Sequence, residues 1–174
     1  MYVFLLILLI SATITDLFRH KIPNAISLGG IAAGFVCQGW FVGTEGLLDG
    51  ILGLLVGFML FLPFYAWHAM AAGDVKLMAM VGTFVGPKVA LVCVASTLIL
   101  GMVLALGYSA MSGKGKKLFH RYGLMMKTFF TTLKCIYIPP AADDAGAIRF
   151  PYALAIFTGT AFALWYMEIT VFNF

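Results

Sequence analysis

Two aspartates interrupt apolar parts of the sequence, where an acidic side chain is unusual. Asp16 lies in "SATITDLFRHKIPN" at the end of one apolar run, and Asp74 lies in "HAMAAGDVKLMAM" within another. Two carboxylates that meet in a pocket of low dielectric constant cannot easily both ionise, so the pair shares a proton. One carboxylate can then activate water while the other polarises or protonates a scissile carbonyl. This is the chemistry of an aspartic protease.

The composition indicates that lipid, not water, surrounds most of the chain. Of 174 residues, 63% are hydrophobic and 10% are charged, against roughly 25% charged in soluble domains. The net charge of +4 is too small and too dispersed to indicate binding of nucleic acid. The three cysteines, Cys37, Cys93 and Cys135, match neither a CxxC motif nor the spacing of metal ligands. We therefore expect no metal and no organic cofactor.

Six apolar stretches predict an all-α, polytopic membrane bundle that forms a single domain over residues 1–174. Crossing the hydrocarbon core takes about 20 apolar residues. The predicted spans are residues 2–17, 25–43, 47–67, 75–86, 88–109 and 150–172. The fourth is short, so we expect it either to extend through the turn at Gly73 and Asp74 or to lie tilted and buried among its neighbours. A kink at Gly86–Pro87 separates it from the fifth.

The charges predict the orientation of these spans. With the N-terminus outside, every Lys and Arg except Lys88 falls on the cytoplasmic side, as the positive-inside rule requires. No basic residue precedes the first apolar run, whereas Arg19 and Lys21 follow it, so we expect a retained helix rather than a cleaved signal peptide.

This topology places Asp16 and Asp74 at the same depth, near the cytoplasmic face. Asp16 ends the first span and Asp74 begins the fourth, and ionisable residues within reach of the bilayer are functional candidates by default. Asp49 also borders an apolar span, but near the outer face. The alternative for either acid alone is a solvated position among the headgroups or a helix cap.

Residues around the acids suggest supporting roles. Gly73 lets a substrate backbone or an opposing helix approach Asp74. Lys76 is two residues from Asp74 on a helix, so we expect it to point elsewhere and anchor in the headgroups. In the linker "HKIPN", Pro23 fixes a turn and Asn24 is expected to cap the second span.

Two further patterns concern packing and the bilayer surface. Small residues four apart favour close approach of helices in lipid; the pairs are Gly30 and Gly34, Gly46 and Gly50, Gly53 and Gly57, and Gly82 and Gly86. Within a cytoplasmic or interfacial segment over about 110–149, residues 117–137 place an apolar stripe opposite basic residues, which predicts an interfacial helix able to bind anionic headgroups. The alternative is a poorly hydrophobic seventh span.

Three segments resemble those of the type IV prepilin peptidases, integral-membrane aspartic proteases with a Gly-x-Gly-Asp motif. "TDLFRHKIPN" is similar to the first aspartate motif of that family, and "AAGDVKLMAMVGTFVGP" to the second. "RFPYALAIFTG" resembles the opening of its last helix. The resemblance covers most of residues 10–109 and 148–160.

By this resemblance, Asp16 and Asp74 are the catalytic pair, and the substrates are prepilin-like precursors. The cut falls on the cytoplasmic side of the bacterial inner membrane, just ahead of the hydrophobic helix of the precursor. The remaining motif or substrate-proximal residues implied are Gly73, Ala71, Ala72, Lys76, Lys21, Pro23 and Asn24. Ala71 stands where the family motif has its first glycine.

The chain resembles the short form of the family, which accompanies tight-adherence (Flp-type) pilus systems. The long forms carry a cytoplasmic segment with paired CxxC motifs and methylate the new N-terminus, so the resemblance implies a peptidase without N-methyltransferase activity. Two alternatives are a non-catalytic membrane subunit of a pilus or secretion system and a proton-coupled transporter. A transporter is expected to have further charges near mid-bilayer, yet the second, third, fifth and sixth spans have none in their apolar centres.

Overall fold

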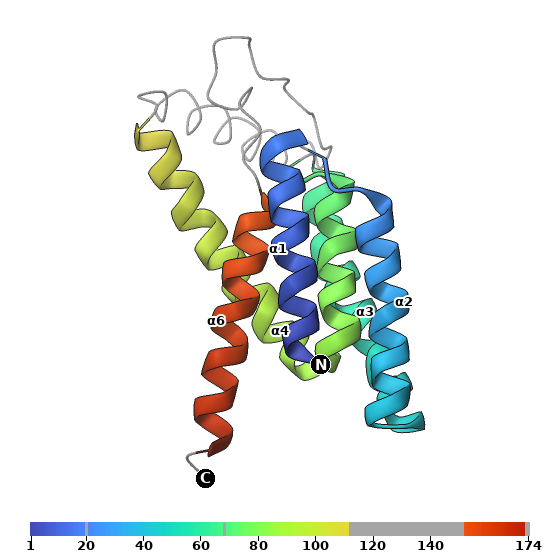
Figure 1. The fold of residues 1–174 in the computed structure, drawn as a ribbon. Coiled ribbons are helices and arrows are strands. Elements are labelled where there is room, and N and C mark those ends of the chain that lie inside the picture. The colour runs from blue at the N-terminus through green and yellow to red at the C-terminus, as the bar shows by residue number, and fades with distance from the viewer. Residues whose placement is uncertain (20, 68, 112–151, 173–174) are drawn as a thin grey trace, which may run out of the picture. The chain divides into compact units, whose positions relative to one another are not determined.

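The structure, a computed structural model, describes residues 1–19, 21–67, 69–111 and 152–172. In these residues it is all helical, which confirms the predicted class (Figure 1). The elements are α1 (Tyr2–Arg19), α2 (Asn24–Phe41), α3 (Thr44–Ala66), α4 (Ala72–Met111) and α6 (Tyr152–Phe172). The predicted interfacial helix over 117–137 lies outside the described residues.

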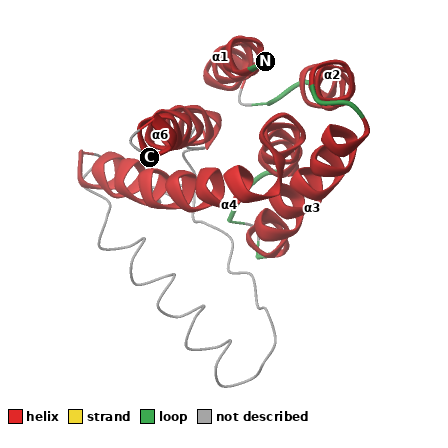
Figure 2. Cartoon of the chain, turned by 90° about the horizontal axis from the view of Figure 1, so that it is seen from below, coloured by secondary structure: helices red, strands yellow, loops and turns green. Residues whose placement is uncertain are grey.

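The chain divides into two compact units, residues 1–101 with 151–174, and residues 102–150. The contacts below all lie within the first unit, where α2 packs against α3 and α1 packs against both α2 and α6. Figure 2 shows these helices from one end, with α2 beside α3 and α1 beside α6.

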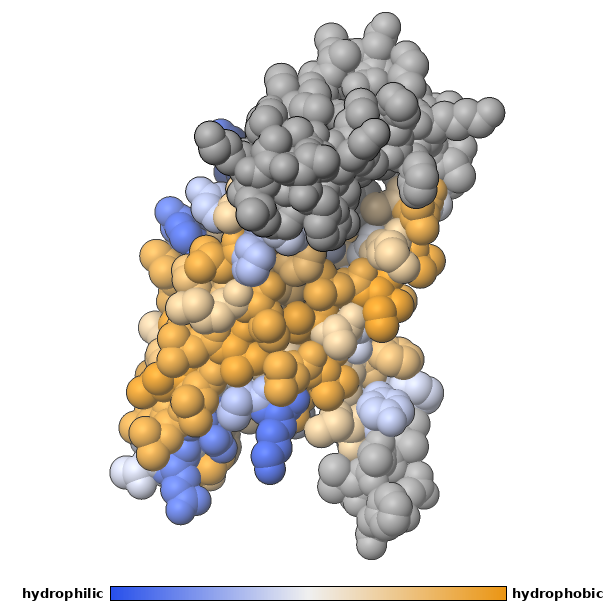
Figure 3. All heavy atoms as spheres, turned by 180° about the vertical axis from the view of Figure 1, so that it is seen from behind, coloured by the Kyte–Doolittle hydropathy of each residue, from blue (hydrophilic) through white to orange (hydrophobic). Residues whose placement is uncertain are grey.

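The described helices have the length and the surface of a membrane protein. Three are long and apolar enough to cross a bilayer, namely Tyr2–Arg19, Thr44–Ala66 and Ala72–Gly107, and Tyr152–Met167 is a shorter apolar helix. Large apolar side chains are exposed along them, Phe18 and Trp40 each to 84%. Figure 3 shows this apolar surface on one face of the molecule. The protein is therefore a membrane protein, and the count of six spans stays a prediction.

A break at Gly86 divides α4 into two helical halves, residues 72–85 and 87–111. Gly86 has φ 74° and ψ 174°, a conformation that glycine adopts without the strain of a side chain. Pro87 reinforces the break because it has no N–H to donate and disfavours helical backbone in the residue before it. The predicted kink is confirmed, and Figure 1 shows the chain turning back there.

The side chain of Gln38 in α2 satisfies a carbonyl group near this break. The Phe84 carbonyl lies two residues before Gly86, where the backbone leaves the helical conformation. Gln38, which is 4% exposed, donates from Nε2 to the Phe84 carbonyl oxygen at 3.1 Å. An amide buried at the end of α2 thus stabilises the turn inside α4.

Replacing Gln38 by Leu should lower the free energy of unfolding by about 1–3 kcal/mol, because it removes a buried hydrogen-bond donor from the Phe84 carbonyl. Unfolding of the purified protein in detergent, followed by circular dichroism, measures the change. A variant as stable as the original would show that this hydrogen bond does not stabilise the break.

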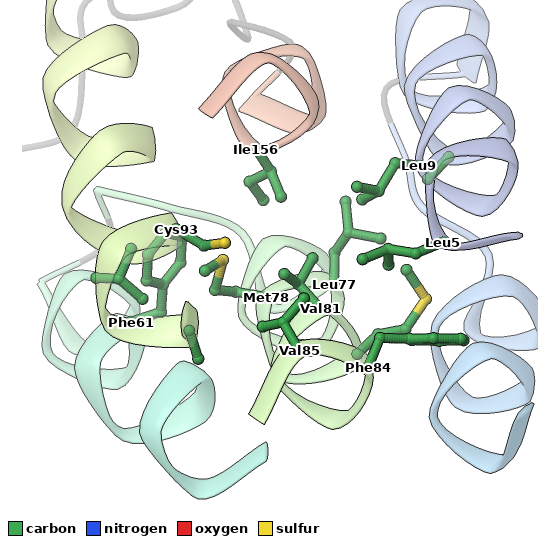
Figure 4. Packing of buried hydrophobic residues seen from close by; sticks show 14 of the residues in the cluster. Leu5, Leu9, Phe61, Leu77, Met78, Val81, Phe84, Val85, Cys93 and Ile156 are labelled. Carbon is green, nitrogen blue, oxygen red and sulfur yellow. The ribbon is translucent and has the colours of Figure 1, made fainter. Parts of the chain in front are cut away.

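The first half of α4 lies in the middle of the core. Its residues 77–85 are all buried, as a helix that is apolar on every side requires. Figure 4 shows Leu5 and Leu9 of α1 on one side of it, Phe61 of α3 on another, and Ile156 of α6 directed towards it. The first expectation for the short fourth span is confirmed, since α4 begins at Ala72 and runs through Gly73 and Asp74, and this half is also buried.

Glycines allow α3 and α4 to approach closely. A Cβ atom on Gly53 would collide with the carbonyl group of Gly82, and one on Gly82 with the carbonyl group of Gly53. A Cβ on Gly57 would lie 2.5 Å from the carbonyl oxygen of Met78. The prediction that these small residues lie in helix contacts is confirmed, and the two helices pack backbone against backbone.

Candidate active site

The two aspartates singled out from the sequence lie at the same end of the first unit. Asp16 is in the last turn of α1 and Asp74 in the first turn of α4, and both ends lie together in Figure 1. Both are buried, Asp16 to 8% exposure and Asp74 to 5%. The two carboxylates interact electrostatically. Helix packing thus brings together two acids that are 58 positions apart in the sequence.

Asp74 is held by the start of its own helix. Its Oδ2 accepts a hydrogen bond of 3.0 Å from the backbone N–H of Ala71, the residue before α4 begins. An acidic side chain at the third helical position that reaches back in this way satisfies one of the donors a helix leaves unpaired at its N-terminus. The carboxylate is therefore fixed over the first turn of α4.

Asp16 is held by the start of a different helix. Its Oδ2 accepts from the backbone N–H of Ala153 at 3.3 Å, in the first turn of α6, where unpaired donors and the helix dipole favour a negative charge. One turn earlier in α1, the Thr13 hydroxyl lies 2.8 Å from the Leu9 carbonyl oxygen and 3.3 Å from that of Ala153. The N-terminus of α6 is thus joined to α1 beside the acid.

The linker between α1 and α2 lies against the first turn of α4. A Cβ atom on Gly73 would lie 3.2 Å from Cβ of Ile22, so the small residue beside Asp74 makes room for this linker. Lys76 donates from Nζ to Oδ1 of Asn24 at 3.0 Å. The linker that follows Asp16 is therefore attached to the helix that carries Asp74.

Two expectations about this linker need correction. Asn24 does not cap α2, because Pro23 occupies the cap position with φ −61° and ψ 135° and the helix start has no side-chain cap. The Asn24 side chain instead accepts from Lys76, so the lysine does not simply extend into the headgroups. Lys21, Ala71 and Ala72 are exposed at this end of the bundle.

The hydrogen bond between Lys76 and Asn24 should appear as a coupling in a double-mutant cycle. We expect Asn24→Ala and Lys76→Met each to lower the free energy of unfolding by about 0.5–1.5 kcal/mol, and the double variant to lose less than the sum. Unfolding in detergent measures all four proteins. Strictly additive losses would contradict a direct interaction.

The first turn of α6 is part of the site, and the sequence did not identify it as such. Besides the Ala153 amide, Tyr152 is half-buried there, with its hydroxyl beside Gly101 of α4. The available signal was the segment "RFPYALAIFTG", which marked the opening of a helix but assigned no residue to the acids. Among the described residues, no group of three or more His, Cys, Asp or Glu side chains could hold a metal ion.

A comparison with known families identifies the chain. The type IV leader peptidase family matches it over residues 3–106, more than half of its length and the part that carries Asp16 and Asp74. No curated protein and no solved structure matches the chain. Together with the apolar helices described above, this match makes the protein a membrane peptidase that belongs to the type IV leader peptidase family.

Proposed function

We propose that the protein is an aspartic endopeptidase that removes the leader from prepilin-like precursors, with Asp16 and Asp74 as its catalytic pair. The observation that carries the proposal is that two buried acids from α1 and α4 interact with each other at one end of the bundle. Buried carboxylates are rarely tolerated without a partner or a task. Two acids that share a proton can hydrolyse a peptide bond, so catalysis would explain why both are buried here. This activity agrees with the family of the chain.

The mechanism uses the two acids in opposite protonation states. The ionised carboxylate takes a proton from water as the water oxygen bonds to the scissile carbonyl carbon, while the protonated partner donates to the carbonyl oxygen. The C–N bond then breaks: the leaving amine takes a proton from the acid that accepted one from water, and one hydroxyl of the tetrahedral intermediate returns its proton to the other acid as the C=O bond re-forms. Backbone amides of Ala71 and Ala153 each hold one oxygen of a carboxylate, so both acids are oriented before substrate binds.

The charges of the described residues support a cytoplasmic location of the site. Arg19, Lys21 and Lys76 lie at the end of the bundle that holds the acids, whereas Glu45 and Asp49 lie in the first turns of α3 at the other end. Basic residues concentrate on the cytoplasmic side of membrane proteins. In this orientation the N-terminus of α1 lies on the outer side of the membrane, and the two acids lie at the interface between the membrane and the cytoplasm.

The substrate follows from this location. A precursor whose hydrophobic helix lies in the bilayer, with a charged leader in the cytosol, has its scissile bond at the depth of the acids. Flp-type pilins are our choice among such precursors, because the chain resembles the short form of the family.

Reconstitution with a precursor tests the proposal. Purified protein and an Flp-type prepilin are placed together in liposomes, and the mass of the product locates the cut. We expect a single cut immediately ahead of the hydrophobic helix, and no cut in a matched precursor that has its leader but lacks that helix. Absence of cleavage, or cleavage within the hydrophobic helix, would contradict the proposed function.

A further inference from the structure

The side of Asp74 that faces away from the core is built from small residues. Residues 77–85, further along α4, are all buried, so a peptide cannot reach the carboxylate through the core. The three residues before the acid are Ala71 and Ala72, which are exposed, and Gly73, which is half-buried. A substrate backbone must come within about 3.5 Å of the acid, and this first turn, with no side chain larger than a methyl group, is the side from which it can do so.

The side chain of Ile22 lies over this first turn. A Cβ atom on Gly73 would stand 3.2 Å from Cβ, 3.6 Å from Cγ1 and 3.5 Å from Cδ1 of Ile22, so the isoleucine extends along the glycine. Both acids are nearly closed off, at 8% exposure for Asp16 and 5% for Asp74. The place beside Asp74 that a peptide would need is therefore occupied by a side chain of the protein itself.

The segment that carries Ile22 can move more easily than the helices that carry the acids. It lies between α1 and α2 and belongs to neither helix (Figure 1). Ile22 is only half-buried, and the far end of the segment is held by the exposed hydrogen bond between Lys76 and Asn24. Segments with few buried contacts and exposed hydrogen bonds open at a low cost in free energy. Both α1 and α4, by contrast, contribute fully buried side chains to the core, so the segment can be displaced while the acids stay in place.

We propose that Ile22 is a plug of the active site, a side chain that covers the first turn of α4 in the free protein and moves aside when the precursor binds. The apparent affinity for the precursor is then reduced in proportion to the fraction of molecules in which the place is open. The covered arrangement keeps other peptide segments at the membrane surface away from the two acids. The inference rests on the proposed function, since it assigns Ile22 to the entry of the same substrate.

A reversible crosslink tests whether the plug must move. In Ile22→Cys/Gly73→Cys the two Cβ atoms would stand 3.2 Å apart, slightly closer than is usual in a disulfide, and a small shift of the half-buried Ile22 segment widens that distance. We expect oxidation to lower the rate of precursor cleavage about tenfold or more, because it leaves few molecules open, and reduction of the same sample to restore the rate. Ile22→Cys alone, given the same oxidant, controls for Cys37, Cys93 and Cys135. Equal rates before and after formation of the crosslink would overturn the proposal.

A smaller side chain in place of Ile22 tests the same movement and leaves Gly73 unchanged. For Ile22→Ala we expect KM to fall about three- to tenfold, since less apolar contact favours the covered arrangement. The value of kcat should stay within about twofold, because the acids are untouched. A water-soluble carbodiimide should modify Asp74 faster than in the original protein, as mass spectrometry of the labelled protein would show. The matched control is Ile31→Ala, which shortens another half-buried isoleucine packed on the same core and should change neither KM nor the labelling.

The outcomes separate this inference from the proposed function. Unchanged KM and unchanged labelling in Ile22→Ala, with Asp74→Asn inactive, would overturn the plug and leave the proposed function intact. A rise in KM would also overturn it, since the isoleucine would then bind the precursor, and so would equal effects of Ile22→Ala and Ile31→Ala, which would reflect a general loosening of the bundle. Full cleavage by Asp74→Asn would instead remove the proposed function, and the labelling of Asp74 would still report whether Ile22 covers it.

Discussion

Asp16→Asn and Asp74→Asn should each reduce the rate of precursor cleavage by about 10³-fold or more, within the range that general acid–base groups contribute. An amide can neither take the proton from water nor return one to the leaving amine. Asparagine keeps an acceptor oxygen, so the N–H groups of Ala71 and Ala153 remain paired and the helices should stay folded. Single-turnover cleavage in liposomes gives the rate, and thermal unfolding in detergent checks the fold.

Asp49→Asn is the matched control for this pair. Asp49 is exposed near the start of α3, at the end of the bundle away from the acids, so its replacement should leave the rate unchanged. The double variant Asp16→Asn/Asp74→Asn should be about as slow as either single one, because groups that act as a unit are not additive. If either single variant cleaves at the original rate, these aspartates are not the catalytic pair.

Gly53→Ala and Gly82→Ala should destabilise the protein without touching the acids. Each new methyl group would collide with a backbone carbonyl of the facing helix, and a backbone cannot move aside as a flexible side chain can. We expect the free energy of unfolding to fall by roughly 1–3 kcal/mol for either alanine, and Gly82→Leu to prevent folding. Unfolding in detergent, and the yield of monodisperse protein for the leucine variant, provide the measurements.

Gly29→Ala separates this steric effect from the general influence of alanine on a helix. Gly29 lies in α2 with nothing within 4 Å of an added Cβ, so alanine should be neutral or stabilising there by up to about 1 kcal/mol. Equal effects at Gly29 and Gly82 would mean that the close approach of α3 and α4 is not what limits stability.

Much of the fold could be predicted from the sequence because lipid imposes simple rules. The length of each apolar run predicts which segments cross the bilayer as helices. The observed helix ends lie within about three residues of those predicted. Because successive spans cross in opposite directions, the end of the first span and the start of the fourth lie at the same end of the bundle. This alternation was enough to predict that Asp16 and Asp74 lie at that end. The break at Gly86 followed from a glycine and a proline side by side.

The details around the acids could not be predicted, because they depend on how each helix is rotated about its axis. The bond between Lys76 and Asn24 joins residues far apart in the sequence, and no local pattern favours it over the capping role expected for Asn24. The hydrogen bond from Ala153 to Asp16 arises from the packing of α6 on α1. Hydrophobicity is nearly uniform around α6, so its sequence does not reveal which face meets the acids.

The shortness of the helical half that carries Asp74 has a consequence for biogenesis. Residues 72–85 make about 21 Å of helix at 1.5 Å per residue, less than the ~30 Å of the hydrocarbon core, and this half is surrounded by α1, α2, α3 and α6. A translocon cannot release such a segment into the bilayer as an independent anchor, so it must enter as a hairpin with the half that follows. Its enclosure is complete only when α6 has been made. A nascent chain arrested before α6 would hold Asp16 without its Ala153 donor, so under the proposed function we expect it to cleave only after that helix is inserted.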